Sequence, residues 1–296
     1  MKISTLATIV TLLLATSCAQ QQQTRSDKPV VSVSILPQKY FIEQLAGDMI
    51  DVNVLIPPGA SPATYEPSVS QLSHLDQSAM YMTIGYLGFE LSWMDKIRSV
   101  NPTMELISMS DGIQLIGGDE PEDHHMDHHG HGHQHEGVDP HIWMSARNAR
   151  EMALNTANAL CRLLPDDSVQ IAVKLSALIS ELDSLDHYIG EILSGEKGRS
   201  FMIYHPALSY FARDYELKQL SLEWEGKTPS PSHMKELTDL GREQGITTIF
   251  IQLEFNKQNA EILSKEIGAE IVSINPLDYD WHGQMIQIAT KLKEAW

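Results

Sequence analysis

Histidine side chains are concentrated in one short stretch of this chain, and their density suggests metal binding. Seven of the 13 histidines lie there, at His124, His125, His128, His129, His131, His133 and His135. Neutral imidazole is the commonest protein ligand for late first-row divalent metals, so the stretch predicts metal capture. Its irregular spacing, interleaved glycines and lack of cysteine specify no closed four-ligand site. We expect a solvated His-rich loop over 120–137 that is not essential for binding, with a plain charged linker as the alternative.

Two histidines outside this loop follow sequence patterns that suit ligands. His141 stands in Asp-Pro-His-Ile-Trp, and His205 closes the predicted strand Phe201–Pro206. We expect both to lie at or beside strand ends. Taken alone, each would more often be a hydrogen-bonded structural residue. Three other histidines lie in helical or capping contexts and are interpreted as surface or packing residues, namely His74, His187 and His233.

An alternation of predicted strands and helices provides a frame for these candidate ligands. One alternating unit starts at Val30 and ends near Ser108, and a second starts at Phe201. Strands separated by helices predict parallel sheets covered by helices on both faces, and binding sites beyond the carboxyl ends of their strands. In the second unit, Ser232 is the candidate N-cap of a helix. The expected fold is α/β with two lobes, each a mostly parallel sheet flanked by helices.

One long helical segment separates the two units. Apolar residues recur at steps of three and four between residues 167 and 193, namely Ile171, Leu175, Leu178, Leu182, Leu185, Ile189 and Ile192. A helix of about 27 residues would be roughly 40 Å long, so we predict a spacer that joins the lobes. The expected boundaries are an N-terminal lobe at 30–148, a helical region at 149–197 and a C-terminal lobe at 198–296.

The N-terminal 18 residues predict export. Lys2 precedes an apolar run, and small residues lead to Cys18 in a pattern that resembles a bacterial lipobox. We expect lipidation of Cys18, a disordered tether over 19–29 and a position on the extracytoplasmic or periplasmic face of a bacterial membrane. An ordinary signal peptide with an incidental cysteine is the alternative. The only other cysteine, Cys161, has no partner, which excludes a structural disulfide.

Charge and size narrow the classes of partner. The chain has 296 residues, 42% of them hydrophobic, and a formal net charge of −18. Such an excess of acidic groups disfavours nucleic acids and anionic membrane surfaces, both of which require basic patches, and favours cations. We expect a monomer that binds a metal ion and no nucleic acid.

The order of several motifs resembles the zinc and manganese solute-binding proteins of ABC importers, the ZnuA/TroA-like (cluster A-I) family. The motifs are PPGASPATYEPS, the His-rich acidic loop, DPHIWMS, the long helix, YHPALSYFARDY, EGKTPSPSHM and INPLDYD. The resemblance covers nearly the whole mature chain. It implies a metal bound between two α/β lobes by three histidines and usually a carboxylate or water, with His141 and His205 as two of the ligands. It also implies an ABC permease as partner.

Two positions depart from the family pattern. Ala63 stands where the family usually has its first histidine, and Asn275 stands where it commonly has an aspartate. The missing donors could come from a histidine of the 120–137 loop, from Asn275 itself, or from nearby Glu66, Asp278, Asp280 or His282; alternatively, the cleft binds weakly. Glu225 is interpreted as part of a proline-fixed turn.

The sequence therefore predicts a lipid-anchored receptor that captures Zn²⁺, with Mn²⁺ as the alternative cargo, and delivers the ion to an ABC importer. Two alternatives remain open: a manganese- or iron-binding member of the same family, and a zinc scavenger or chaperone lipoprotein that uses no permease. A metal-dependent hydrolase is disfavoured because the sequence has no His-Glu-x-x-His motif, nucleophile elbow or Ser-His-Asp order. We expect no enzymatic activity.

Overall fold

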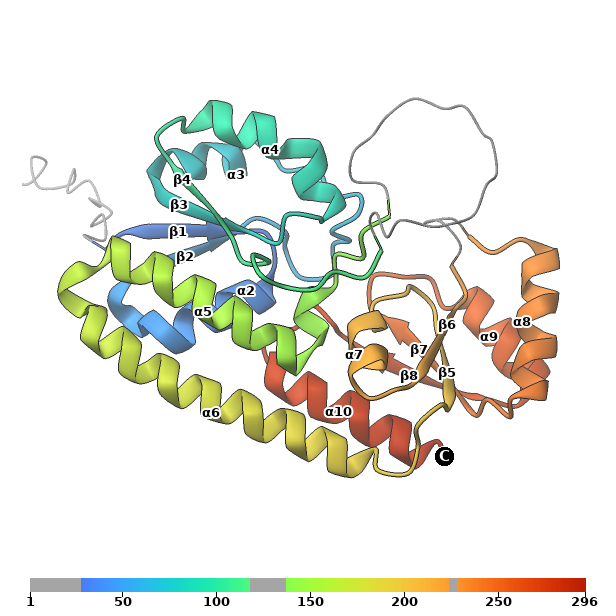
Figure 1. Ribbon diagram of the computed structural model, residues 1–296. Coiled ribbons are helices and arrows are strands. Elements are labelled where there is room, and N and C mark those ends of the chain that lie inside the picture. The colour runs from blue at the N-terminus through green and yellow to red at the C-terminus, as the bar shows by residue number, and fades with distance from the viewer. Residues whose placement is uncertain (1–27, 118–136, 224–227) are drawn as a thin grey trace, which may run out of the picture.

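Two lobes lie side by side, each built around a four-stranded parallel sheet (Figure 1). The computed structural model describes residues 28–117, 137–223 and 228–296. The N-terminal sheet contains β1 (Val30–Val33), β2 (Asp51–Val54), β3 (Ser78–Thr83) and β4 (Glu105–Ser108). The C-terminal sheet contains β5 (Ser200–Ile203), β6 (Lys218–Ser221), β7 (Thr248–Gln252) and β8 (Glu270–Ile274). The predicted two-lobed α/β fold is confirmed.

The two sheets have the same topology. Their strand orders are β2-β1-β3-β4 and β6-β5-β7-β8, and every pairing is parallel. From the first strand of each lobe the chain adds one strand on one side and then two on the other. The order reverses between β1 and β3, and between β5 and β7, and ligands of such sheets bind beyond the carboxyl ends of the strands at that reversal.

Helices cover the sheets. In the N-terminal lobe, α3 (Val69–His74) and α4 (Gly88–Val100) lie on one face, and α2 (Leu36–Ala46) and α5 (Ala146–Leu163) lie on the other (Figure 1). The C-terminal lobe carries α7 (Ser209–Asp214), α8 (Pro231–Glu243), α9 (Gln258–Ile267) and α10 (Trp281–Glu294). Short 3-10 turns are η1 (Gly47–Met49), η2 (Leu75–Gln77), η3 (Ile142–Met144) and η4 (Pro165–Asp167).

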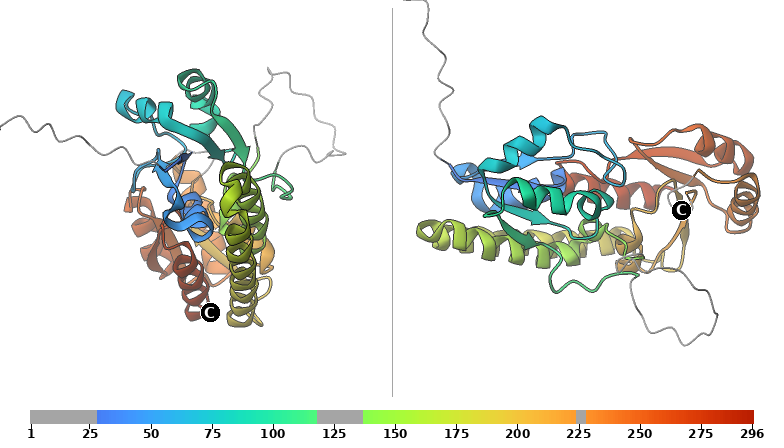
Figure 2. Two further views of the ribbon diagram at one scale, coloured as in Figure 1. Left: turned by 90° about the vertical axis from the view of Figure 1, so that its left-hand side faces the viewer. Right: turned by 90° about the horizontal axis from the view of Figure 1, so that it is seen from above.

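The predicted long helix is present as α6 (Ser168–Ile192), which has 25 residues and is about 38 Å long. It runs along one side of both lobes (Figures 1 and 2). It packs against α5 and α2 of the N-terminal lobe and against α10 of the C-terminal part. Its buried side chains are Ile171, Leu178, Leu182, Leu185 and Ile189, which belong to the apolar series seen in the sequence.

A buried aromatic group joins the lobes as well, which the prediction of a single connecting helix missed. The Trp281 indole donates a hydrogen bond to the carbonyl oxygen of Trp143 (2.7 Å), and its ring centroid lies 5.0 Å from that of Phe41. The Trp143 indole in turn donates to the carbonyl oxygen of Pro276 (2.8 Å). One hydrophobic core therefore continues from the N-terminal sheet to α10, and the lobes are not independent bodies on a tether.

Three local findings complete the fold. Helix α8 begins two residues earlier than expected, since Ser230 and not Ser232 caps it by accepting a hydrogen bond from the His233 amide (3.2 Å). The reason is Pro231, whose fixed φ suits the first helical position and whose missing N–H costs nothing there. Cys161 is half-buried. Within the described ranges, no helix combines the length and apolar character needed to span a membrane.

Candidate metal site

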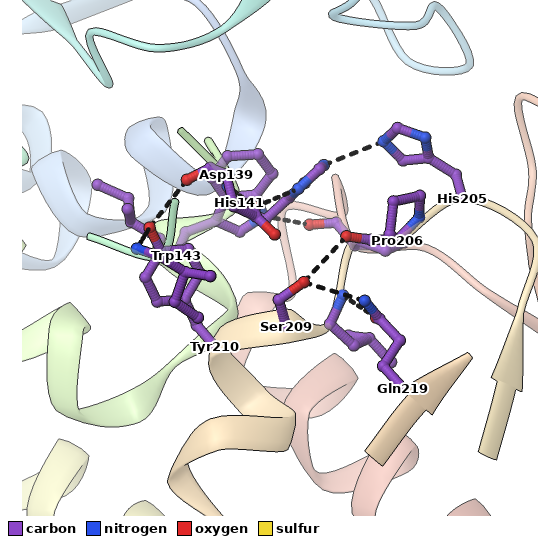
Figure 3. Close-up of polar contacts among 12 residues, drawn as sticks. Asp139, His141, Trp143, His205, Pro206, Ser209, Tyr210 and Gln219 are labelled. Atoms are coloured by element: carbon purple, nitrogen blue, oxygen red, sulfur yellow. Dashed lines mark hydrogen bonds and ion pairs between the residues drawn. The ribbon is translucent and has the colours of Figure 1, made fainter. Parts of the chain in front are cut away.

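The two predicted ligands meet between the lobes. The Nε2 atoms of His141 and His205 are 3.3 Å apart, and the ring centroids are separated by 5.1 Å. Figure 3 shows the two rings pointing toward one another from opposite sides. Both side chains are mostly buried, with 12% and 24% of their surfaces exposed. The structure thus brings two imidazole nitrogens to one place.

Each imidazole is held from behind by a carboxylate. Nδ1 of His141 lies 2.8 Å from Oδ1 of Asp139, and Nδ1 of His205 lies 2.6 Å from Oε2 of Glu223. Burial would raise the pKa of Asp139, but hydrogen bonds from His141 and Ser209 and the charge of His141 hold that pKa below its usual value. Asp139 is therefore ionised at neutral pH and accepts the Nδ1 proton.

This arrangement fixes the ring tautomers. A neutral histidine that donates from Nδ1 has a lone pair on Nε2, and metal-bound histidines typically show this carboxylate–imidazole relay. With both Nδ1 atoms facing carboxylates, both Nε2 lone pairs are directed at the same point. Two lone pairs repel each other at hydrogen-bond distance, so the pair is suited to a cation placed between them.

The end of β7 holds His205 in position. The Gln252 side chain donates to the main-chain oxygen of His205 (2.6 Å) and accepts from its main-chain amide (3.3 Å). The Phe255 ring stacks on the imidazole at 5.2 Å with an interplanar angle of 20°. Since β5 and β7 are neighbours in the sheet, His205 lies at the reversal of strand order in the C-terminal lobe.

His141 is positioned differently from the prediction. Among the residues that the structure describes, the preceding strand, β4, ends far earlier at Ser108, and His141 directly precedes the 3-10 turn η3. The Asp139 side chain also accepts from the His141 amide (2.9 Å), which forms a tight local turn around Pro140. The carboxylate that orients the imidazole is thus supplied by the same Asp-Pro-His motif.

Tyr210, on α7 of the other lobe, holds both ends of the segment that contains the His-rich stretch. Its hydroxyl donates to the carbonyl oxygen of Asp139 (2.8 Å) and accepts from the amide of Ile116 (3.0 Å). The Asp139 amide also donates to the Ile116 carbonyl oxygen (2.8 Å). The segment therefore leaves and rejoins the fold at one point, directly beside His141.

The two histidines open onto a cavity of about 500 Å³. This volume would hold roughly 17 water molecules, far more than one ion requires. Most of the wall is apolar and includes Leu87, Trp143, Pro206, Phe255 and Leu277. Besides the histidines, the ionisable side chains that line it among the described residues are Asp139 and Glu254.

The structure separates the other candidates. Ala63 does line the cavity, so the position where the family usually has a histidine borders the same cavity as the two imidazoles. Glu66 is exposed and lies outside the cavity wall. Asn275 and Asp278 also lie outside it and are hydrogen-bonded to each other (2.9 Å).

Two further candidates have other roles in the fold. Asp280 caps α10 by accepting from the Gly283 amide (3.1 Å), and His282 lies 3.8 Å from Glu181. Cys18, Glu225 and the seven loop histidines, His124, His125, His128, His129, His131, His133 and His135, lie outside the described residues.

Sequence reasoning missed two carboxylates of the site, Glu223 and Glu254. Glu223 follows the end of β6 and Glu254 follows the end of β7, and both strands are neighbours of β5 in the sheet. That position beyond a strand was the signal that could have identified them. Among the described residues, no three His, Cys, Asp or Glu side chains already surround one point as a complete metal site.

The chain is similar in sequence to known proteins. The family model "ZnuA: Zinc-uptake complex component A periplasmic" matches residues 31–295. The chain is 30% identical over 283 residues to the zinc-binding lipoprotein AdcA of Streptococcus pneumoniae (strain ATCC BAA-255 / R6). The matched region covers 94% of this chain and 55% of AdcA. It thus spans about half the length of that relative.

Solved structures show the same fold. A crystal structure of ZnuA superposes with a TM-score of 0.82 at 35% identity and covers 91% of this chain and 99% of that chain. The structure of Zn(II)-bound AdcA from Streptococcus pneumoniae gives a TM-score of 0.72 at 25% identity, with 90% of this chain and 57% of that chain covered.

Proposed function

We propose that this chain, which belongs to the family of periplasmic zinc-uptake components (ZnuA), captures Zn²⁺ between its lobes and presents the ion to an ABC permease. The observation that carries this proposal is the pair of Nε2 atoms 3.3 Å apart, each on a ring whose Nδ1 faces a carboxylate. Neutral imidazole suits zinc, and the relay fixes the coordinating tautomer.

The arrangement of the lobes supports a binding role. His141 belongs to the segment before η3 and His205 to the end of β5, so an ion between them contacts both lobes at once. A cation that bridges two parts of the fold stabilises their contact, and this contact is what a permease could distinguish from the metal-free form. The role is that of a carrier, and we propose no chemical conversion of the cargo.

The site of action follows from the same reasoning. We propose an extracytoplasmic protein with Cys18 lipidated, residues 19–29 as tether, and lobes bounded at 30–148 and 198–296. The relative AdcA carries the name of a zinc-binding lipoprotein, which supports this view. Mass spectrometry of the mature protein from membranes tests it, with a diacylglyceryl group on Cys18 as the expected result and a cleaved, unmodified N-terminus as the opposing one.

Calorimetric titration of the mature domain with zinc tests the capture itself. We expect one site between the lobes with a dissociation constant below about 10 μM, in addition to weaker binding by the His-rich loop over 120–137. A variant with His141→Ala and His205→Ala together should lose this binding, whereas His187→Ala, which removes an exposed histidine on α6, should keep it. Equal binding by all three proteins would overturn the proposal.

Zinc must also be distinguished from manganese and iron, the alternative metals that the sequence left open. Nitrogen donors favour zinc, whereas manganese sites use more oxygen ligands. Metal analysis of protein purified without added metal should therefore find zinc in excess.

A further inference from the structure

The C-terminal lobe presents a second functional segment beside His205. Three residues in sequence order, Gln252, Glu254 and Phe255, line the cavity at the end of β7. Gln252 is fixed to the main chain of His205 through two hydrogen bonds, and Phe255 stacks on its ring. Glu254 lies between these two contacts in the chain. Its main chain is therefore fixed relative to the imidazole.

The carboxylate of Glu254 has an acceptor atom with no partner. Its Oε2 is shielded from solvent and forms no hydrogen bond, although the residue lines the cavity. Burial raises the pKa of Glu254, while a hydrogen bond from its own amide and the charge of His205 oppose that effect. A buried oxygen without a partner is destabilising, so a group of this kind needs an explanation such as an ion.

The other carboxylates near the imidazoles have partners. Oδ1 of Asp139 accepts from His141, and Oε2 of Glu223 accepts from His205, so both are committed to orienting the rings. Glu254 orients neither ring. Among the described residues of the cavity wall, it is the carboxylate with a buried oxygen that has no hydrogen-bond partner.

We propose that Glu254 coordinates the captured cation together with His141 and His205, and that it takes the place of the imidazole missing at Ala63. This inference rests on the proposed zinc capture. Since no three ligands yet surround one point among the described residues, the Glu254 side chain changes rotamer when the cation enters. Its unpaired oxygen then gains a partner, and its negative charge offsets part of the charge of the ion.

The consequence concerns metal selectivity. A site of two nitrogens and one carboxylate oxygen is harder than a site of three nitrogens, and oxygen donors suit manganese better than imidazole does. Zinc remains favoured over manganese by intrinsic affinity, but the preference should be narrower than with three histidines. Glu254 is thus a determinant of specificity as well as a ligand.

Calorimetry on three proteins tests this: the unmodified chain, Glu254→Gln, and Glu261→Gln as control. Glu261 is an exposed residue of α9, and its replacement removes the same charge from the same lobe. We expect Glu254→Gln to weaken zinc binding at least ~10-fold and manganese binding more strongly, with Glu261→Gln unchanged. Circular dichroism melting should show both variants folded.

X-ray absorption at the zinc edge gives an independent count of ligands. Imidazole rings produce outer-shell scattering that carboxylates lack, so we expect two imidazoles plus oxygen. A count of three imidazoles, or equal zinc affinity of Glu254→Gln and the unmodified chain, would overturn the role of Glu254 while leaving zinc capture intact. Failure of the unmodified chain to bind zinc would overturn both.

Discussion

The two lobes share one topology, but they differ in the hydrogen bonding of a carboxylate that lies near the ends of their central strands. In the N-terminal lobe Glu90 lies at the reversal between β1 and β3 and accepts hydrogen bonds from the amides of Ile84 (3.0 Å) and Gly85 (2.5 Å) and from the Ser34 hydroxyl. Glu90 is 2% exposed. In the C-terminal lobe Glu254 lies at the equivalent reversal, with an oxygen that has no partner.

The comparison shows what makes a strand end available for a ligand. In the N-terminal lobe the protein's own carboxylate already occupies the donors that such a sheet would otherwise offer to an anion. In the C-terminal lobe the strand ends carry an imidazole and a carboxylate that face a cavity. The same fold therefore holds a carboxylate whose oxygens are hydrogen-bonded within the lobe in one case, and in the other a carboxylate with an unpartnered oxygen, which we propose binds a cation.

The substitution with the largest expected effect tests whether the two lobes unfold as one cooperative unit. Trp281→Ala should lower the free energy of unfolding by about 3–5 kcal/mol, because its ring is fully buried in the core shared with Phe41. Urea unfolding followed by circular dichroism measures this. Trp296→Ala, which removes a partly buried terminal ring, is the control and should cost less. Two separate transitions in the unmodified protein would contradict a shared core.

The buried carboxyl group of Glu90 in the N-terminal lobe should make the stability of the protein depend on pH. Burial raises the pKa of Glu90 from 4.5 to about 7, although hydrogen bonds from Ser34, Ile84 and Gly85 oppose it. The folded state therefore holds this proton more tightly than the unfolded state, so its contribution to stability is present below pH 4.5 and is lost as pH rises to about 7.

The stability of the unmodified protein relative to Glu90→Gln should therefore fall by about 3 kcal/mol between pH 4.5 and 7.5. Urea unfolding at both pH values measures the difference. Glu66→Gln, at an exposed carboxyl, should show no such change. If the stability difference between the unmodified protein and Glu90→Gln were the same at both pH values, the pKa of Glu90 would not be raised in the folded state.

The carboxylates behind the imidazoles test whether the lobes contribute equally to the ion. Asp139→Asn and Glu223→Gln should each weaken zinc binding about 10- to 100-fold, since each replaces the anionic acceptor that fixes a ring tautomer with a neutral amide. Calorimetry measures both. Asp76→Asn, in η2 away from the cavity wall, serves as control. A loss confined to one of the two variants would show that a single lobe dominates capture.

The smallest expected effect moves a ligand from one lobe to the other. Ala63→His should strengthen zinc binding about 10-fold, because the new imidazole faces the cavity from the N-terminal lobe. It should also restore binding to Glu254→Gln. Thr64→His, at an exposed neighbour outside the cavity wall, should do neither. No gain from Ala63→His would place residue 63 out of reach of the ion.

Periodic signals explain what the sequence could predict. The strand–helix alternation and the stripe of α6 repeat locally, so the fold and the long helix followed from them. His141 and His205 came from motif order, and their facing nitrogens agree with that hypothesis. Trp281, Trp143 and Phe41 lie far apart in the chain, and no local pattern predicts their contact. Glu254 is likewise a single carboxylate after a strand, and its candidate role as a ligand depends on the two histidines that only the fold brings to the same cavity.

The double hydrogen bond of the Tyr210 hydroxyl to Ile116 and Asp139 has a consequence for how this protein can evolve. Each doubling of the length of chain between two positions held together in this way costs only about 0.6 kcal/mol in closure entropy. Insertions and deletions between Ile116 and Asp139 should therefore change the stability of the described fold little. The number of histidines in this stretch of sequence can then change during evolution without a change in the lobes.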